Sequence, residues 1–326
     1  MGETMKITCT CGGQSIGDFI TRATWSGDES QAARKLEFSI AYNPKDVTFN
    51  NLSIPIGARI KFIADNYHIF SGRIFYRKRT SNTYTYDFTA YDDMIYLAKS
   101  KISKLFDKVS ATDAIKQVCN EIGIPVSKDI MNISTLVTFF ADNMSCTEIF
   151  EKIFELAKAD MKEKYAAIYI NDAVTVVKRG TLIENYIASD TVDVISSDHS
   201  ESIEDMVNRV KLVDEKGSVI SVVRNDEDIA NYGILQDIHK IEPPREGQVD
   251  NMAQARAKLK SVKNESSLNA VGNIQCITGY TVTVQEEQLK GNFYIKSDSH
   301  TFENNKHMMT LTLEYIEGSA VHARNK

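Results

Sequence analysis

The stretch TRATWSGDESQAARKLEFSI, residues 21–40, decides how the chain begins to fold. In its second half Leu36, Phe38 and Ile40 alternate with polar side chains. A period of two is typical of a β-strand that buries one of its faces. The first half carries the single tryptophan of the chain, Trp25, next to residues that favour chain reversal. The stretch therefore predicts a strand, a turn and a second strand, which begin an all-β unit.

The segment Trp25-Ser26-Gly27-Asp28 allows two functional interpretations, a ligand site and a catalytic elbow, because serine, aspartate and a lone aromatic ring are common in active sites. No general base, metal-ligand set or phosphate loop accompanies it in the sequence. We therefore predict an architectural role. Ser26, Gly27 and Asp28 are expected to close one strand, and Trp25 to anchor the packing at the end of a β-barrel.

The residues that follow continue the alternating pattern. ARIKFIADNYHIFSGRIFYR, residues 58–77, predicts a hairpin with its turn at Asp65 and Asn66. TYTYDFTAYD, residues 83–92, alternates aromatic and polar side chains in the same way. Four or more consecutive strands with tight turns predict a small antiparallel barrel or sandwich.

The pattern then changes to that of helices. Ser110 begins a stretch with helical spacing that Gly123 stops, and Ser145 begins a second one with Glu148 in the capping-box position. AAIYINDAVTVVKR, residues 166–179, predicts a hairpin about Asn171-Asp172. These elements together indicate a small α+β unit.

The last third of the chain returns to β patterns. Residues 187–205 are rich in serine and aspartate and are interpreted as a connecting segment. Strands resume around a turn at 215–217, and a helix is predicted over 250–263 after the Pro243-Pro244 break. The chain is predicted to be α+β and mainly β. We expect a first β-barrel in 1–95, an α+β insert in 96–195, and a second β-barrel with one helix in 196–326.

Composition limits the classes of function. The 326 residues suit two or three domains, and 42% hydrophobic with 25% charged residues is ordinary for a globular chain. A net charge of -6 gives no electrostatic basis for binding nucleic acid. The sequence shows no signal peptide and no apolar run of about 20 residues. We expect synthesis and folding in the cytoplasm, with no membrane insertion by this chain.

The 5 cysteines are odd in number and scattered, which disfavours a disulfide framework. Cys9 and Cys11 are too close together for the usual CxxC metal clip, so we predict a strand with two small apolar thiols. Cys119 lies on the apolar stripe of a predicted helix, and Cys146 at the start of the next helix is a poor second candidate for a nucleophile. We expect no cysteine chemistry.

The remaining candidates for chemistry are weak. His300 and His307 flank the TFENNK turn and could meet across a hairpin, but two imidazoles and one acid fall below the usual complement of metal ligands. Neither phosphate-loop motif and no GxSxG elbow occurs, and Asp198-His199-Ser200 cannot converge as adjacent residues. The Asp92-Asp93 pair is explained by a helix start. We predict no catalytic residue, cofactor or metal, and favour assembly as the function class.

Three stretches together resemble a known family. They are ITRATWSGDESQAARKLEFSIAYNP, then GARIKFIADNYHIFSGRIFYRKR with FTAYDDMIYLAKSK, and finally GNFYIKSDSHTFENNKHMMTLTLEYIE. In this order they resemble the XkdQ/YqbQ-type hub proteins of Gram-positive prophage tails and phage-tail-like bacteriocins. That family is related to the late control D protein of contractile phages and to the hub part of the type VI secretion spike. The residues that carry the resemblance are Trp25, Ser26, Gly27, Asp28, Tyr91, Asp92, Tyr96, Leu97, Asp298 and His300.

The resemblance implies a structural baseplate hub with two tube-like β-barrels in each chain. Three chains would form a ring whose six barrels imitate the sixfold tail tube, while the threefold remainder holds the central spike. The implied partners are two further copies of the chain, the tail tube protein, the central spike protein and other baseplate proteins. The implied location is the bacterial cytoplasm during assembly and then the baseplate of the phage or bacteriocin particle. A tail-tip peptidoglycan hydrolase and a receptor- or carbohydrate-binding module remain the alternatives.

Overall fold

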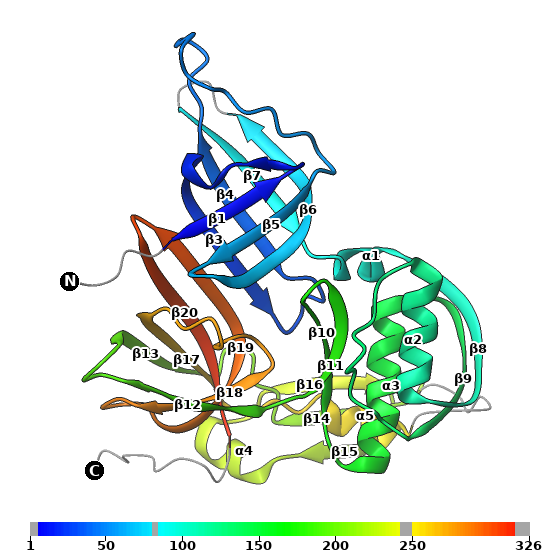
Figure 1. Ribbon diagram of the computed structural model, residues 1–326. Helices are drawn as coiled ribbons and strands as arrows, with labels where there is room; N and C mark the ends of the chain where they lie inside the picture. Colours follow the sequence, from blue (N-terminus) through cyan, green and yellow to red (C-terminus); the bar gives the residue numbers. More distant parts are fainter. Residues whose placement is uncertain (1–5, 80–83, 242–249, 317–326) are drawn as a thin grey trace. The chain divides into compact units, whose positions relative to one another are not determined.

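The computed structural model describes residues 6–79, 84–241 and 250–316, and the proline pair at 243–244 lies outside them (Figure 1). The chain divides into two compact units, a larger one of residues 1–197 with 267–326 and a smaller one of residues 198–266. The prediction that the chain is mainly β is confirmed.

The first β region contains seven strands in the order β3-β4-β7-β6-β5-β1-β2. The predicted hairpin at Asp65-Asn66 is confirmed, since both residues have a positive φ and connect two antiparallel strands. The short η1 turn, Gly17–Phe19, precedes β3. The strands are β1 Ile7–Cys11, β2 Gln14–Ser15, β3 Ile20–Asp28, β4 Lys35–Ala41, β5 Arg59–Ala64, β6 Tyr67–Arg79 and β7 Thr85–Tyr91.

The second β region follows the order β13-β17-β20-β19, with β18 on β19 and β12 on β18. Its strands are β12 Thr181–Ser189, β13 Val194–Ser202, β17 Lys263–Val271, β18 Tyr280–Gln285, β19 Lys290–Glu303 and β20 Lys306–Tyr315. The expected connecting segment over 187–205 is wrong, because most of it belongs to β12 and β13. Asp193 closes the turn between these strands by accepting the N–H of Ser189 at 2.8 Å. Much of β13 is exposed, which removes the need for apolar alternation.

The two β regions form one sheet of thirteen strands and do not close into barrels. The expectation of two closed barrels is therefore wrong in this respect. The edge of β3 that would close the first barrel is hydrogen-bonded to β19 instead. In the second region the described strands end at β13 and β12 without pairing to each other. Figure 1 shows β19 and β20 running from the second region to β3.

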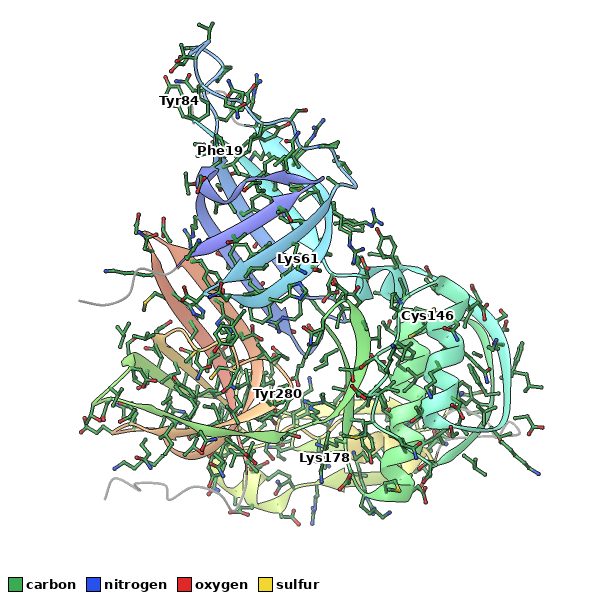
Figure 2. The ribbon with its side chains drawn as sticks, viewed as in Figure 1. Phe19, Lys61, Tyr84, Cys146, Lys178 and Tyr280 are labelled. Atoms are coloured by element: carbon green, nitrogen blue, oxygen red, sulfur yellow. The ribbon has the colours of Figure 1, made fainter. Side chains whose placement is uncertain are left out.

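The α+β block lies between the two β regions in the sequence. Ser110 caps α2 by accepting the N–H of Asp113, and Ser145 forms a full capping box with Glu148 at the start of α3, so both predicted helix starts are confirmed. Figure 2 labels Cys146 in this block, where its side chain is fully buried. The elements are α1 Met94–Lys99, β8 Lys101–Ser110, α2 Ala111–Ile122, β9 Leu136–Ser145, α3 Cys146–Met161, β10 Tyr165–Ile170 and β11 Ala173–Lys178. None of the described helices is long and apolar enough to cross a membrane.

The block contains an internal repeat that sequence reasoning missed. Each half is a ten-residue strand that runs directly into a helix capped by serine, Ser110 in one half and Ser145 in the other. Lys108 and Asn143 hold equivalent positions two residues before the caps, and both have a positive φ. The two strands pair antiparallel with symmetric ends, so that Lys101 lies opposite Ser145.

The smaller unit has a three-stranded sheet in the order β15-β14-β16. Its helix α5 buries Ala255 against Val210 and Leu212 of β14. The predicted helix over 250–263 is too long, because Lys260 leaves the helix to exchange backbone hydrogen bonds with Val207. The helix also packs on this small sheet, and not on a barrel as expected. The elements are β14 Arg209–Val213, β15 Val219–Arg224, α4 Asp226–Tyr232, β16 Gln236–Lys240 and α5 Asn251–Ala257.

Candidate assembly site at the junction of the two β regions

Strand β19 is shared by both β regions. Its first half, from Lys290 to Tyr294, pairs with β18, and its second half, from Ser297 to Glu303, pairs with β3. The change of partner takes place at a bulge around Lys296, whose carbonyl accepts the N–H of Glu29 at 2.9 Å. A single 14-residue strand therefore fixes the register of the first region against the second.

Asp298 lies directly after the change of partner and has a fully buried side chain. Its Oδ1 accepts the backbone N–H and the hydroxyl of Thr278, each at 2.7 Å, and the Nη1 of Arg34 at 2.9 Å. The second guanidinium nitrogen bonds Oδ2. Burial alone would raise the pKa of Asp298, but the Arg34 guanidinium lowers it below its ordinary value. The carboxylate thus stays charged and links the β3–β4 connection to the residue that leads into β18.

Trp25 and Gly27 fit around this ion pair. The guanidinium carbon of Arg34 lies 3.9 Å from the centroid of the Trp25 ring, within range of a cation–π interaction. Gly27 lies opposite Asp298 in the β3–β19 ladder, and a Cβ atom there would collide with the guanidinium group of Arg34. The glycine is therefore required by the close approach of a side chain, and not by a turn.

His300 and His307 meet across the β19–β20 hairpin, as their spacing in the sequence suggested. The Nε2 of His300 donates to the carbonyl of Cys276 at 3.0 Å, so its Nδ1 accepts from the Nε2 of His307 at 3.0 Å. Burial lowers the pKa of His300 to about 4 and that of His307 to about 3, so both rings are neutral at pH 7. Both nitrogens of His300 are occupied by hydrogen bonds. The pair serves as a hydrogen-bonded part of the junction, against the Trp25 ring 5.1 Å away.

Asp92 and Asp93 join the junction to the α+β block. Asp92 accepts the backbone N–H of Arg34 at 3.1 Å and that of Met94 at 3.0 Å. Burial raises the pKa of Asp92 to about 7 against the effect of these hydrogen bonds. Asp93 accepts from Arg59 at 3.2 Å and from the hydroxyl of Tyr169 at 2.9 Å. The pair therefore does more than begin a helix, because its hydrogen bonds connect α1, β5 and β10.

The other residues of the family resemblance lie in different surroundings. Tyr91 and Tyr96 both pack against Phe75, with ring centroids 5.6 and 5.8 Å from it, and Leu97 is fully buried in the core of the α+β block. The structure thus brings Trp25, Gly27, Asp92, Asp298 and His300 to one junction and places these three beside it. The role of the whole set in assembly stays a prediction.

The segment Trp25 to Asp28 is the end of a strand, so the expected turn within it is wrong. Ser26 and Asp28 lie opposite Ser299 and Ser297 of β19, and the chain reverses only afterwards, where Gln31 donates to the carbonyl of Asp28. The ladder with β19 holds the glycine extended, which a local pattern cannot reveal. The prediction that Trp25 is a packing residue agrees with its burial, with 6% of its surface exposed.

Sequence reasoning missed Arg34, Thr278 and the carbonyl of Cys276. Arg34 stands directly before the alternating strand, and a cation beside a strand start carries no signal for a buried ion pair. Its partner is 264 positions away in the chain. The junction is a long-range arrangement that brings together residues from the β3–β4, β7–α1 and β17–β18 connections.

The burial and the hydrogen-bond partners of the other candidate residues account for them without chemistry. Cys9 and Cys11 are buried in β1, as the strand interpretation predicted, and burial raises the pKa of both thiols. His199 lies on β13 and its Nδ1 is 2.9 Å from the hydroxyl of Ser266, a partner from another strand. The described residues contain no group of three or more His, Cys, Asp or Glu side chains placed to hold a metal ion.

Solved structures with the same fold include phage and secretion proteins. The 43 kDa tail protein of prophage MuSo2 from Shewanella oneidensis superposes with a TM-score of 0.69 at 12% identity, covering 97% of this chain and 100% of that one. The c3393 protein of Escherichia coli, a type VI secretion component similar to the bacteriophage T4 tail proteins gp27 and gp5, superposes with a TM-score of 0.51 at 8% identity. It covers 98% of this chain and is covered over 78% of its own length. These likenesses establish a shared fold.

Sequence relatives identify the family. The YQBQ-like family model matches residues 23–314, so the chain belongs to the YQBQ-like family. The uncharacterized protein YqbQ of Bacillus subtilis is 25% identical over 305 residues, which are 90% of this chain and 91% of that protein. The phage-like element PBSX protein XkdQ of the same organism is 24% identical over 293 residues, which are 87% of this chain and 89% of that protein. The resemblance drawn from the three stretches is thereby confirmed.

Proposed function

We propose that this protein is the structural hub of a contractile tail or bacteriocin baseplate, a trimeric adaptor between the sixfold tail tube and the threefold central spike. The observation that carries the proposal is the shared strand β19, which joins two β regions of one chain in a fixed register. The phage-like element relative and the tail-protein fold support the same assignment. The proposed partners are two further copies, the tube protein, the spike protein and other baseplate proteins.

The physical basis of this role is symmetry matching. Two β regions in each chain give six in a trimer, which can face a sixfold ring while the rest of the chain keeps threefold symmetry. The sheet ends at strand edges that the described part of the chain leaves unpaired. Such edges favour pairing with neighbouring chains. The three-domain division at residues 95 and 195 belongs to this proposal, as does assembly in the bacterial cytoplasm before incorporation into the particle.

Sedimentation velocity of the full chain, combined with negative-stain imaging, tests the oligomer directly. We expect a mass three times that of the 36.6 kDa chain and a ring with threefold symmetry and a central opening. A mixture with the tube protein should extend the ring along its axis. A chain that stays monomeric alone and with its tail partners would refute the trimeric hub.

The proposal includes a non-enzymatic role. Zymography on peptidoglycan separates it from the tail-tip hydrolase, and a glycan array separates it from the carbohydrate-binding module. We expect neither lysis nor glycan binding, because the charged groups of the junction are buried and paired. Lysis that a single carboxylate or cysteine substitution abolishes would overturn the non-enzymatic assignment.

A further inference from the structure

A crevice of about 990 Å³ lies within the larger unit, bounded by the first β region, the α+β block and the residues that lead into β18. Every residue of β10, from Tyr165 to Ile170, lines it. Side chains of neighbouring strand residues point to opposite faces, so a cavity lined by all of them is bounded by the edge of the strand. The crevice therefore exposes the edge of β10.

The hydrogen-bonding groups of that edge follow from the register of the hairpin. Ile170 pairs with Ala173 beside a two-residue turn, so alternate residues of β10 bond to β11. Tyr165, Ala167 and Tyr169 are the alternate residues whose N–H and C=O groups point away from β11. Val174, the residue opposite Tyr169, confirms this assignment. Its N–H donates to the carbonyl of Pro125 and its carbonyl accepts the N–H of Ser127, so both groups point away from β10. No described residue pairs with the outer edge of β10.

Two side chains that line the same crevice have buried N–H groups without an acceptor. They are the Nε1 of Trp25 and the Nε of Arg34. Trp25 is 6% exposed, and its indole nitrogen can only donate. These two nitrogens are themselves buried, whereas the free edge of β10 faces the crevice, and an extended polypeptide pairs with such an edge through its backbone. The ligand chemistry that fits the crevice is that of an extended polypeptide segment.

The same chain offers a segment of this kind. The β12–β13 hairpin ends the second β region, and the part of β13 that belongs to the larger unit, residues 194–197, has one edge that pairs with no described strand. Val192 in its turn is 82% exposed and Ile195 on β13 is 61% exposed, so apolar side chains accompany the free edge. The β10 edge is recessed, with Tyr165 and Tyr169 each 8% exposed. Two recessed edges cannot meet about a twofold axis, so the complement has to be an exposed edge, and most side chains of β13 are exposed.

We propose that the crevice receives the free edge of β13 from a second copy of the chain, which adds as a strand to β10. This contact joins two different surfaces, so repeating it does not give a twofold dimer, and it gives a closed ring when three copies complete the rotation, as the proposed trimeric hub requires. The inference rests on the proposed trimeric hub and assigns the surfaces of its ring contact. Backbone pairing provides the affinity, and Ile195 enters the apolar part of the crevice.

The test is the substitution Ala167→Pro in the full chain. Proline removes the N–H that points away from β11, so the hairpin itself loses no hydrogen bond. We expect at least a tenfold weaker association by sedimentation, while Ala167→Ser, which keeps the N–H, associates like the wild type. Ile195→Lys should weaken association similarly, and Ile195→Thr, which stays uncharged and suits a strand, should weaken it much less. Thermal unfolding checks that all four variants are folded.

Hydrogen exchange separates failure of this inference from failure of the hub. In the wild-type ring the amides of Tyr165, Ala167 and Tyr169 should exchange at least tenfold more slowly than in the diluted monomer. A ring that forms with fast exchange at these amides, and with Ala167→Pro fully associated, overturns the β10 contact and leaves the hub intact. A chain that never assembles overturns both. A twofold dimer also overturns the proposal, because it requires a self-complementary contact.

Discussion

The junction at β19 and the core of the α+β block both lie inside the larger unit, yet different forces hold them. The junction contains a charged Arg34–Asp298 pair and two neutral histidines, all linked by hydrogen bonds. The block is filled by apolar side chains such as Ile115 and Ile149, both fully buried. Buried apolar contacts lose stability in proportion to the volume removed, whereas a buried ion pair fails when one partner is removed and the other stays charged. The comparison teaches that the junction depends on particular pairs of side chains, and that replacing one member of a pair lowers its stability more than a matched change in the block.

The largest expected effect is that of Arg34→Met, which leaves Asp298 charged and buried without its partner. We expect a loss of about 3–5 kcal/mol in the free energy of unfolding, measured by urea denaturation. The double variant with Asp298→Asn should recover part of this loss, because the uncompensated charge is gone. A loss below about 1 kcal/mol for Arg34→Met would mean that the junction behaves as a surface ion pair.

The matched change in the block is Ile149→Ala, which creates a cavity beneath α3. We expect a loss of about 3 kcal/mol in urea denaturation, and about 1 kcal/mol for the smaller change Ile149→Val. No second substitution should restore the stability of either variant in the way that Asp298→Asn restores part of the stability of Arg34→Met. Equal rescue in both regions would remove the distinction drawn between them.

The pH dependence of the junction follows from its histidines. The folded pKa of His300 is about 4, below the ordinary 6.5, so the unfolded chain takes up the proton first as the pH falls. Stability from His300 is therefore present above pH 6.5 and is lost between pH 6.5 and 4. Asp92 acts in the opposite sense, because its raised pKa of about 7 gives stability that is present below pH 3.8 and lost as the pH rises toward 7.

The substitution His300→Gln isolates the first of these contributions. Between pH 7 and pH 5 the wild type should lose about 2 kcal/mol more than this variant, with Asp92 contributing equally to both. The readout is the change with pH in denaturant midpoints, and not the absolute stability, since His300 also bonds Cys276 and His307 and lies near the charged Asp298 and Arg34. Parallel pH profiles for the two proteins would show that His300 does not titrate as its burial requires.

The smallest effects are expected at the helix caps of the internal repeat. Ser110→Ala and Ser145→Ala should each cost about 1 kcal/mol in denaturant unfolding, because each removes a side-chain acceptor for a helix N–H. The two losses should be nearly equal, since the caps hold equivalent positions. A marked inequality would show that the symmetry of the repeat does not extend to its energetics.

The elements that the sequence predicted well are those set by near neighbours. The turn at Asp65-Asn66 needs two residues that tolerate a positive φ, and the caps at Ser110 and Ser145 need an acceptor within the first turn. Such signals lie within a few positions of the structure that they specify. The alternation of Leu36, Phe38 and Ile40 likewise places a strand without reference to the rest of the chain.

The candidate site could be predicted only in part, because its contacts join distant segments. The family resemblance selected Trp25, Gly27, Asp298 and His300, which do meet, but nothing near Arg34 indicates its partner 264 positions away. The closed barrels were wrong because β3 pairs with β19, and partner choice among strands is a property of the whole sheet. The strands over 187–205 were missed because an exposed edge strand has no apolar alternation.

Because both β regions use β19, the fold fixes the number of residues between the two paired halves of this strand. Beyond the bulge at Lys296 its side chains alternate between two faces, so one extra residue directly before Asp298 would turn every later side chain of the strand to the opposite face. Asp298 and His300 would then leave the interior, and both β regions would lose their common register. Connections such as the one between β4 and β5 can absorb insertions at a modest entropic cost. We therefore expect length differences among related chains to occur in the connections, and not in β19 between the half that pairs with β18 and the half that pairs with β3.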